Sequence, residues 1–234
     1  MTLAAEEAQH MRGVLRLKPG DEVFVFDGLG HEYLCRIENL RRDAATLAIL
    51  EEVEAASPES SLDLTLALAL LKGEKFDLAV QKATELGVTR IVPVMTKLAD
   101  IRLRDERDAE KRTARWRRIA LEAAKQSGRA RLPAIEEPRD FDSLLESASH
   151  NGGEWALMFV ERGGGSLAQS HEASDRPRSL TALVGPEGGW TDEETQAARD
   201  RHWQTITLGG RVMRAETAAI AITALLQHLY GDLR

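Results

Sequence analysis

The sequence predicts an α/β fold in which a small N-terminal β-barrel precedes a larger domain with a mostly parallel sheet. Two observations carry this prediction. Short strands separated by glycine turns dominate residues 22–53, whereas strands and helices alternate from residue 62 onward. Short strands with tight turns are typical of a small barrel. Strands that alternate with helices are typical of a parallel sheet covered by helices. The 234 residues are enough for two such domains.

The first domain is predicted over residues 1–56. It begins with a helix at about 4–15. Three strands follow, and glycines stand at the turns between them, where the chain must reverse. The strands are "EVFVFD", "HEYLCRIEN" and "ATLAILEEV". Residues 57–61 are predicted to be a linker, because "AASPESS" at 55–61 is small, polar and interrupted by proline.

The second domain is predicted over residues 62–234. Its strands are "LDLTLALALL", "RIVPVM", "WALMFV", "LTALVG" and "TITL". Helices are predicted at about 75–86, 108–126, 191–201 and 214–229. Gly87 and Gly128 end the first two of these helices. Residues 163–178 show no core-forming pattern and are predicted to be a flexible surface loop.

Composition narrows the class of protein. The net charge of −7 argues against a protein that coats nucleic acid over its whole surface, although a local basic face is compatible with it. Cys35 is the only cysteine, so no intrachain disulfide can form. The N-terminus has acidic residues where a signal peptide would be basic, and the apolar run at 64–71 is too short to span a membrane. We therefore expect a cytoplasmic protein without a membrane segment.

Two glycine stretches follow the ends of late strands. They are "LVGPEGGWTDEE" at 183–194 and "LGGRVMRAET" at 208–217. Glycine allows a ligand to approach the backbone closely, and the spacing of Thr191 and Glu194 predicts a capping box at the start of a helix. Because ligands bind beyond the carboxyl ends of parallel strands, one pocket lined by both loops is predicted. The alternative is that both are only tight turns. Neither stretch has the spacing of a P-loop or a dinucleotide-binding motif.

These two stretches closely resemble the C-terminal motifs of the RsmE family, the bacterial 16S ribosomal RNA uridine-N3 methyltransferases of the SPOUT superfamily. Further similarity lies in "LLKGEKFDLAVQKATELGVTRIVP", "RWRRIALEAAKQSGRARLP" and "HMRGVLRLKPGD", so it covers nearly the whole chain. The resemblance implies a SPOUT-type domain with a deep trefoil knot, a PUA-like RNA-binding barrel, bound S-adenosylmethionine and a homodimer. No metal is expected, since the six histidines lack ligand spacing.

The resemblance also assigns cofactor-binding positions. These are Leu183, Gly185, Gly188, Leu208, Gly209, Met213, Arg214 and Thr217. Two positions depart from the family pattern, because Gly210 stands where proline is usual and Ala215 where threonine is common. Family members usually have a short extra segment before the stretch that starts at Leu3. The comparison therefore leaves open an incomplete, truncated barrel or a start that is wrongly placed.

A basic segment predicts RNA contact. Residues 102–131 contain eleven Arg or Lys and five Asp or Glu, a net charge of +6, which leaves −13 for the remainder of the chain. The candidate RNA-binding residues are Arg115, Arg118, Lys125, Arg129 and Arg131, with Arg12, Arg16 and Lys18 in the first domain. The alternative for the segment is a solvated helix with pairs such as Asp108–Arg112.

The chemistry implied is methyl transfer from S-adenosylmethionine to N3 of a single uridine, expected at position 1498, in the 16S ribosomal RNA of the small ribosomal subunit. Arg211 and Arg214 are candidates to face the uracil oxygens, a phosphate or the cofactor carboxylate. Glu216 is a candidate proton acceptor, with a purely structural carboxylate as the alternative. Two other functions stay open: another SPOUT enzyme, for example one that methylates a transfer RNA ribose, and a non-catalytic RNA-binding assembly factor.

Overall fold

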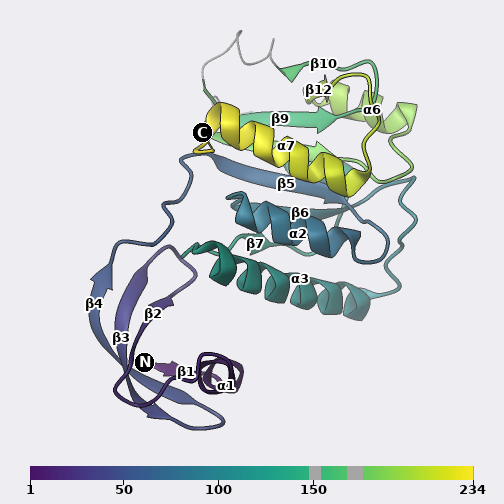
Figure 1. The fold of residues 1–234 in the computed structure, drawn as a ribbon. Coiled ribbons are helices and arrows are strands. Elements are labelled where there is room, and N and C mark those ends of the chain that lie inside the picture. Colours follow the sequence, from purple (N-terminus) through teal and green to yellow (C-terminus); the bar gives the residue numbers. More distant parts are fainter. Residues whose placement is uncertain (148–153, 168–175, 234) are drawn as a thin grey trace. The chain divides into compact units, whose positions relative to one another are not determined.

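The computed structural model describes residues 1–147, 154–167 and 176–233, and it divides the chain into two compact units (Figure 1). The smaller unit comprises Met1–Pro58 together with Ser127–Leu132, and the larger one comprises Glu59–Gln126 and Pro133–Arg234. The short segment Ser127–Leu132 belongs to the smaller unit because Arg131 pairs with Gly28 and Leu29 in isolated β-bridges. The sequence pattern, in contrast, predicts this segment to lie in the second domain.

The smaller unit is a curled antiparallel sheet backed by one helix. Its strands lie in the order β1-β4-β3-β2, so β1 and β2 are the edges of an open half-barrel. The elements are β1 (Thr2–Leu3), α1 (Ala5–Gly13), β2 (Glu22–Phe26), β3 (Glu32–Leu40) and β4 (Ala45–Val53). The core lies between the sheet and α1, where Ala8 and Met11 meet Cys35, Ile37 and Leu47. Burial raises the pKa of the Cys35 thiol, as is usual for a cysteine that serves as a small core residue.

The larger unit is built on one sheet in which every described strand pair is parallel. The strand order is β10-β12-β9-β11-β5-β6-β7, and β8 also pairs with β6. The strands are β5 (Asp63–Ala69), β6 (Arg90–Met95), β7 (Ala134–Ile135), β8 (Arg139–Asp140), β9 (Glu154–Phe159), β10 (Gly165–Ser166), β11 (Ser179–Val184) and β12 (Gln204–Thr207). The predicted parallel sheet is confirmed.

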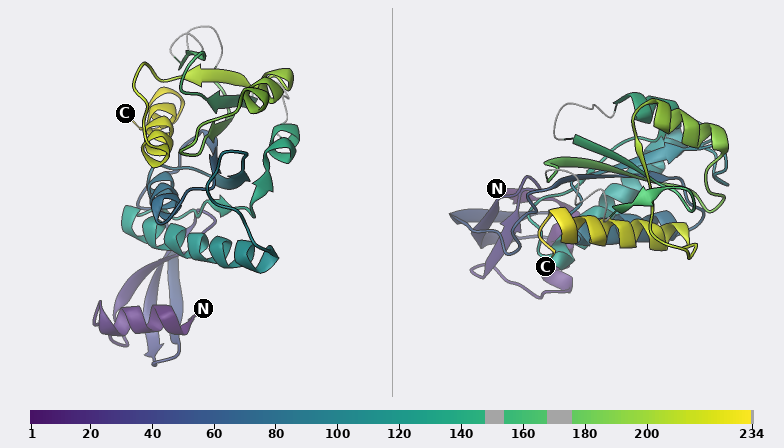
Figure 2. Two further views of the ribbon diagram at one scale, coloured as in Figure 1. Left: turned by 90° about the vertical axis from the view of Figure 1, so that its right-hand side faces the viewer. Right: turned by 90° about the horizontal axis from the view of Figure 1, so that it is seen from above.

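Helices cover both faces of this sheet (Figure 2). They are α2 (Lys75–Glu85), α3 (Glu106–Ser127), α4 (Phe141–Ser147), α6 (Asp192–Asp200) and α7 (Ala215–Tyr230). On one face, residues of α2, α3 and α7 share a core cluster with Val184 of β11. On the other face, residues of α4 and the end of α6 pack with Leu183. Successive residues of a strand point to opposite faces, so the side chains of Leu183 and Val184 lie on opposite faces of the sheet.

The structure corrects one prediction and adds elements to others. Part of the predicted loop at 163–178 is ordered, because β10 pairs with β12 and Leu167 is buried. A Cβ on Gly164 would lie 2.6 Å from the backbone of Ile206. Close packing, and not backbone flexibility, therefore explains the glycine at this position. Residues 168–175 of the same loop lie outside the described residues. Helix α4 and the short strands β7 and β8 were not predicted. The trefoil knot stays a prediction.

No helix within the described ranges is long and apolar enough to cross a membrane.

Candidate functional site

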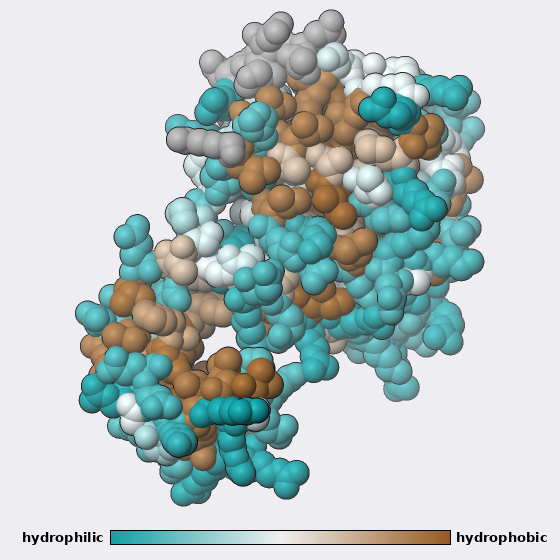
Figure 3. Space-filling model, viewed as in Figure 1, coloured by the Kyte–Doolittle hydropathy of each residue, from teal (hydrophilic) through white to brown (hydrophobic). Residues whose placement is uncertain are grey.

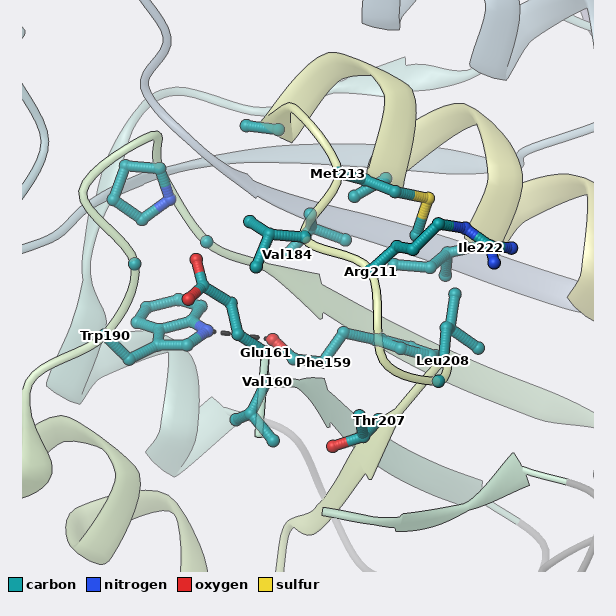
Figure 4. A pocket seen from close by; sticks show the side chains of 17 residues that line it. Phe159, Val160, Glu161, Val184, Trp190, Thr207, Leu208, Arg211, Met213 and Ile222 are labelled. Atoms are coloured by element: carbon teal, nitrogen blue, oxygen red, sulfur yellow. Dashed lines mark hydrogen bonds between the residues drawn. The ribbon is translucent and has the colours of Figure 1, made fainter. Parts of the chain in front are cut away.

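A pocket lies where the carboxyl ends of β9, β11 and β12 meet the start of α7 (Figure 4). Strand β9 lies between β11 and β12 in the sheet, so three adjacent strand ends line the pocket and not only the two that carry glycine stretches. The lining residues are Phe159, Val160, Glu161, Val184, Gly185, Pro186, Gly189, Trp190, Thr207, Leu208, Gly209, Arg211, Val212, Met213, Ala215, Ala218 and Ile222. Most of these side chains are apolar.

Trp190 holds one wall of the pocket in place. Its indole Nε1 donates a hydrogen bond to the carbonyl oxygen of Phe159 at 2.9 Å, which joins the loop after β11 to the end of β9. A Cβ on Gly185 would lie 2.9 Å from this indole ring, so glycine is required where the ring packs against the backbone. The glycine thus has a packing role as well as the ligand role that the sequence predicts.

The loop after β11 ends in the predicted capping box. The backbone N–H of Glu194 donates to Thr191 Oγ1 at 3.1 Å, and the N–H of Thr191 donates to Glu194 Oε2 at 3.0 Å. Glu194 is buried, and its other oxygen accepts from the backbone N–H of Lys97 at 2.8 Å. One carboxylate therefore fixes the start of α6 and ties it to the segment after β6.

Four of the predicted cofactor-binding residues line the pocket: Gly185, Leu208, Gly209 and Met213. Leu183 does not, because its side chain lies in the core on the opposite face of the sheet. Gly188 also lies outside the lining. A Cβ there would come within 2.8 Å of the Leu98 carbonyl oxygen, which accounts for glycine by packing. Arg214 and Thr217 are exposed and outside the lining.

The three predicted catalytic residues occupy different surroundings. Arg211 lines the pocket, whereas Arg214 is exposed at the N-cap of α7. Glu216 is 9% exposed and lines a separate hollow with Lys75 and Asp77 of α2. Among the described residues, no group donates a hydrogen bond to Glu216 Oε2. The structure therefore brings Arg211 to the pocket, and it places Glu216 in the neighbouring hollow.

An ion pair ties the glycine loop to α2. Lys75 Nζ lies 2.8 Å from Glu187 Oε1. Burial alone would raise the pKa of the Glu187 carboxyl, but the hydrogen bond and charge of Lys75, together with backbone hydrogen bonds, hold that pKa below its usual value. The hydrogen bond to Glu187 raises the pKa of Lys75. The stabilisation from the lowered Glu187 pKa is therefore complete above the ordinary glutamate pKa, and it is lost as pH falls through the folded-state value.

Replacing Lys75 with methionine is expected to raise the pKa of Glu187, because burial remains while the largest of the lowering contacts is removed. A nuclear magnetic resonance titration of the Glu187 carboxyl measures this change. Lys82→Met is the matched control, since Lys82 pairs with Glu85 on the same helix. An unchanged Glu187 pKa in Lys75→Met would show that the ion pair does not hold this loop.

The predicted RNA-binding residues differ in exposure and in contacts. Arg12, Arg16, Lys18, Arg118 and Arg131 are exposed, and Arg131 Nε also donates a hydrogen bond to the Leu29 carbonyl oxygen at 3.3 Å. Arg115 is exposed but forms an ion pair with Asp77, and Lys125 pairs with Glu122 at 3.0 Å. The pair Asp108–Arg112 of the solvated-helix alternative is present at 3.3 Å. Arg129 is 4% exposed, so the structure does not present its guanidinium to a phosphate.

Sequence reasoning missed the contribution of β9 to the pocket. Phe159, Val160 and Glu161 come from the end of this strand, and Trp190 comes from the far end of the glycine loop. A signal was available, because "FVERGGG" also places glycines directly after a strand. In the described part of the chain, no three His, Cys, Asp or Glu side chains gather as a metal site would require.

Comparison with known proteins finds two family models along the chain. One, described as an RNA methyltransferase domain, matches residues 58–227, and one described as an RNA methyltransferase PUA domain matches residues 3–50. The ribosomal RNA small subunit methyltransferase E of Synechocystis sp. is 34% identical over 231 residues, which cover 98% of this chain and 73% of that protein.

Two solved structures are similar over the whole chain. The ribosomal RNA small subunit methyltransferase E of Neisseria gonorrhoeae, bound to S-adenosyl methionine, has a TM-score of 0.88 and 33% identity, with coverage of 100% of this chain and 93% of that chain. A Legionella pneumophila protein in complex with the same cofactor has a TM-score of 0.90 and 30% identity, with the same coverage of both chains.

Proposed function

This chain belongs to the family of RNA methyltransferases that carry a PUA domain, and we propose that it methylates N3 of one uridine in the 16S ribosomal RNA of the small subunit. The family resemblance of the two glycine stretches is confirmed, and the protein is an S-adenosylmethionine-dependent RNA methyltransferase. The choice of N3, and of uridine 1498 as the expected target, comes from that resemblance and is part of the proposal.

The pocket at the ends of β9, β11 and β12 is the observation that carries this proposal. Its walls suit S-adenosylmethionine, because apolar side chains such as Leu208, Met213 and Ile222 can pack on an adenine ring while backbone groups at Gly185 and Gly209 stay accessible. When bound, the cofactor supplies an electrophilic methyl group on a sulfonium. The chain contributes positioning, which is the main requirement of an in-line displacement.

The two arginines are assigned different partners. Arg211 lines the pocket, so we assign its guanidinium to the carboxylate of the cofactor, a pairing that arginine geometry favours. Arg214 is exposed outside the pocket lining, so it is the better candidate to stabilise negative charge on the uracil oxygens as the N3 proton passes to solvent water. Glu216 lies in the neighbouring hollow, so we assign it a structural role ahead of a catalytic one.

The proposed partners are the small ribosomal subunit and a second copy of this chain. Hydrophobic residues gather over α7 on the face seen in Figure 3, and Leu225 of this helix is 40% exposed. An alanine-rich helix with an exposed apolar face suits close packing against another helix. This face supports the homodimer that the family resemblance implies.

Transfer of a labelled methyl group from S-adenosylmethionine to different RNA substrates tests the proposal. Small ribosomal subunits from cells that lack the modification, free 16S RNA and unmodified transfer RNA are offered separately. We expect label in the small ribosomal subunits or in free 16S RNA, and none in transfer RNA. Label in transfer RNA would favour the ribose-methylating alternative, and cofactor binding without transfer to any substrate would favour the assembly-factor alternative.

Charge reversal on α3 is expected to weaken RNA binding. Arg118 is exposed in the basic segment, and each phosphate contact contributes about one unit to the slope of log affinity against log salt concentration. Arg118→Glu should therefore reduce that slope by about one unit or more. Arg199→Glu is the control, because Arg199 lies on α6 among the acidic residues Glu193 and Asp200. Equal slopes for the two variants would restore the solvated-helix interpretation of the basic segment.

A further inference from the structure

A carboxylate that has no partner among the described residues stands on the pocket wall. Glu161 directly follows β9, the middle one of the three strands whose ends line the pocket. Its side chain extends beside the Trp190 ring (Figure 4). Glu161 Oε1 lies 3.4 Å from the point where a Cβ on Gly189 would stand. Within the described ranges, no hydrogen bond or ion pair engages the carboxylate of Glu161.

The other polar side chains of the wall differ from Glu161. Trp190 Nε1 already donates to the Phe159 carbonyl oxygen, and Thr207 Oγ1 accepts from the backbone N–H of Gly164 at 2.9 Å. Arg211 carries a positive charge and offers donors only. Among the side chains that line the pocket, Glu161 is therefore the one that offers two strong acceptor oxygens. A ligand group that donates hydrogen bonds is its complement.

We infer that Glu161 accepts hydrogen bonds from the ribose hydroxyls of the cofactor. This inference rests on the proposed function, which places S-adenosylmethionine in the pocket. A vicinal diol offers two donors to the two oxygens of a carboxylate, and hydrogen bonds to an ionised acceptor are the stronger kind. An acidic residue binds the ribose of a dinucleotide in the same chemical way in other folds.

The diol fits better than the amino group of the cofactor. The amino and carboxylate groups share one carbon atom, and Arg211 is the pocket cation that suits this carboxylate. Figure 4 shows Arg211 near Met213 and Ile222, whereas Glu161 lies beside Trp190. If Arg211 holds the amino-acid end, the donors that remain are the adenine amino group and the ribose diol, and the diol is the one that offers a separate hydroxyl to each carboxylate oxygen of Glu161. The Trp190 ring beside it offers an apolar surface that a nucleoside can cover.

Calorimetry with two ligands tests this inference without any turnover. S-adenosylhomocysteine and its 2′,3′-dideoxy analogue are titrated into the wild-type protein, Glu161→Ala, Glu161→Gln and the control Arg162→Ala, which alters an exposed neighbour outside the pocket. Removal of a charged acceptor is expected to weaken S-adenosylhomocysteine binding about tenfold or more. The dideoxy analogue should lose less than about twofold, because it has no hydroxyls to bind. Glu161→Gln should fall between wild type and Glu161→Ala.

Equal losses for both ligands in Glu161→Ala would overturn the inference, because the carboxylate would then act on the amino group or on pocket shape. Unchanged affinity for S-adenosylhomocysteine would overturn it as well. Thermal unfolding of each variant shows that a loss of binding is not a loss of folding. If the wild-type protein binds neither ligand, the proposed function itself fails, which is a different result from failure of the Glu161 assignment alone.

Discussion

Replacing Gly185 with valine is expected to weaken S-adenosylmethionine binding about 100-fold or more. A Cβ at this position would lie 2.9 Å from the Trp190 indole ring, which forms a pocket wall. The ring must then move, which breaks its hydrogen bond to the Phe159 carbonyl oxygen. Overpacking costs about 1–3 kcal/mol and a lost hydrogen bond about 1 kcal/mol. If cofactor binding requires the ring to return to its wall position, both costs are paid on binding, and together they correspond to roughly 100-fold in affinity. Calorimetry with S-adenosylmethionine measures the change.

Gly210→Val is the matched control for this substitution. Gly210 belongs to the second glycine stretch, but a Cβ there would meet no atom within 4 Å, and the residue does not line the pocket. Gly185→Ala tests the same contact with less disturbance of the fold, because it adds only the Cβ that meets the Trp190 ring. Cofactor affinity that is equal in Gly185→Val and Gly210→Val would remove Gly185 from the binding site.

Arg214→Ala is expected to lower the turnover number about 100-fold while the dissociation constant of S-adenosylmethionine changes little. Loss of one group that stabilises developing negative charge has an effect of this size in other enzymes. Arg214 is exposed at the N-cap of α7, and no N-cap side-chain hydrogen bond is formed, so stability should change by less than about 1 kcal/mol. Steady-state kinetics, calorimetry and denaturant unfolding measure the three quantities.

Arg211→Ala provides the comparison, because it lines the pocket. We expect it to weaken S-adenosylmethionine binding about tenfold, since a charged hydrogen bond to the cofactor carboxylate is lost. Full turnover by Arg214→Ala would remove that residue from the active site. A large loss of cofactor affinity in Arg214→Ala, with none in Arg211→Ala, would reverse the two assignments.

The fold was predictable where local pattern and tertiary structure agree. Alternating strands and helices from residue 62 onward predict the parallel sheet, and Thr191 with Glu194 predicts a capping box that the structure contains. The order of the strands was not predictable in this way. Strand β11 lies between β9 and β5, although it follows both in sequence. Such an insertion depends on tertiary packing, which local periodicity does not encode.

The candidate site was also predictable only in part from the sequence. The glycine stretches predicted a pocket because glycine marks places where the backbone must stay accessible, and four of the predicted cofactor residues line it. Glu161 was missed because a single acidic residue after a strand is not a signal by itself. Leu183 precedes Val184 on one strand, so their side chains point to opposite faces. The sequence does not say which of the two faces the pocket, and the structure shows that it is the side chain of Val184.

Mapping of the transferred methyl group identifies the methylated atom, on which the proposed function depends. Small ribosomal subunits that lack the modification are incubated with the protein and labelled S-adenosylmethionine. Their 16S RNA is then digested to nucleosides and analysed by mass spectrometry, and the modified position is located by primer extension. We predict that 3-methyluridine is the labelled nucleoside and that the modified position is uridine 1498. Label on a ribose, on another base or in no nucleoside would contradict methylation of uridine N3.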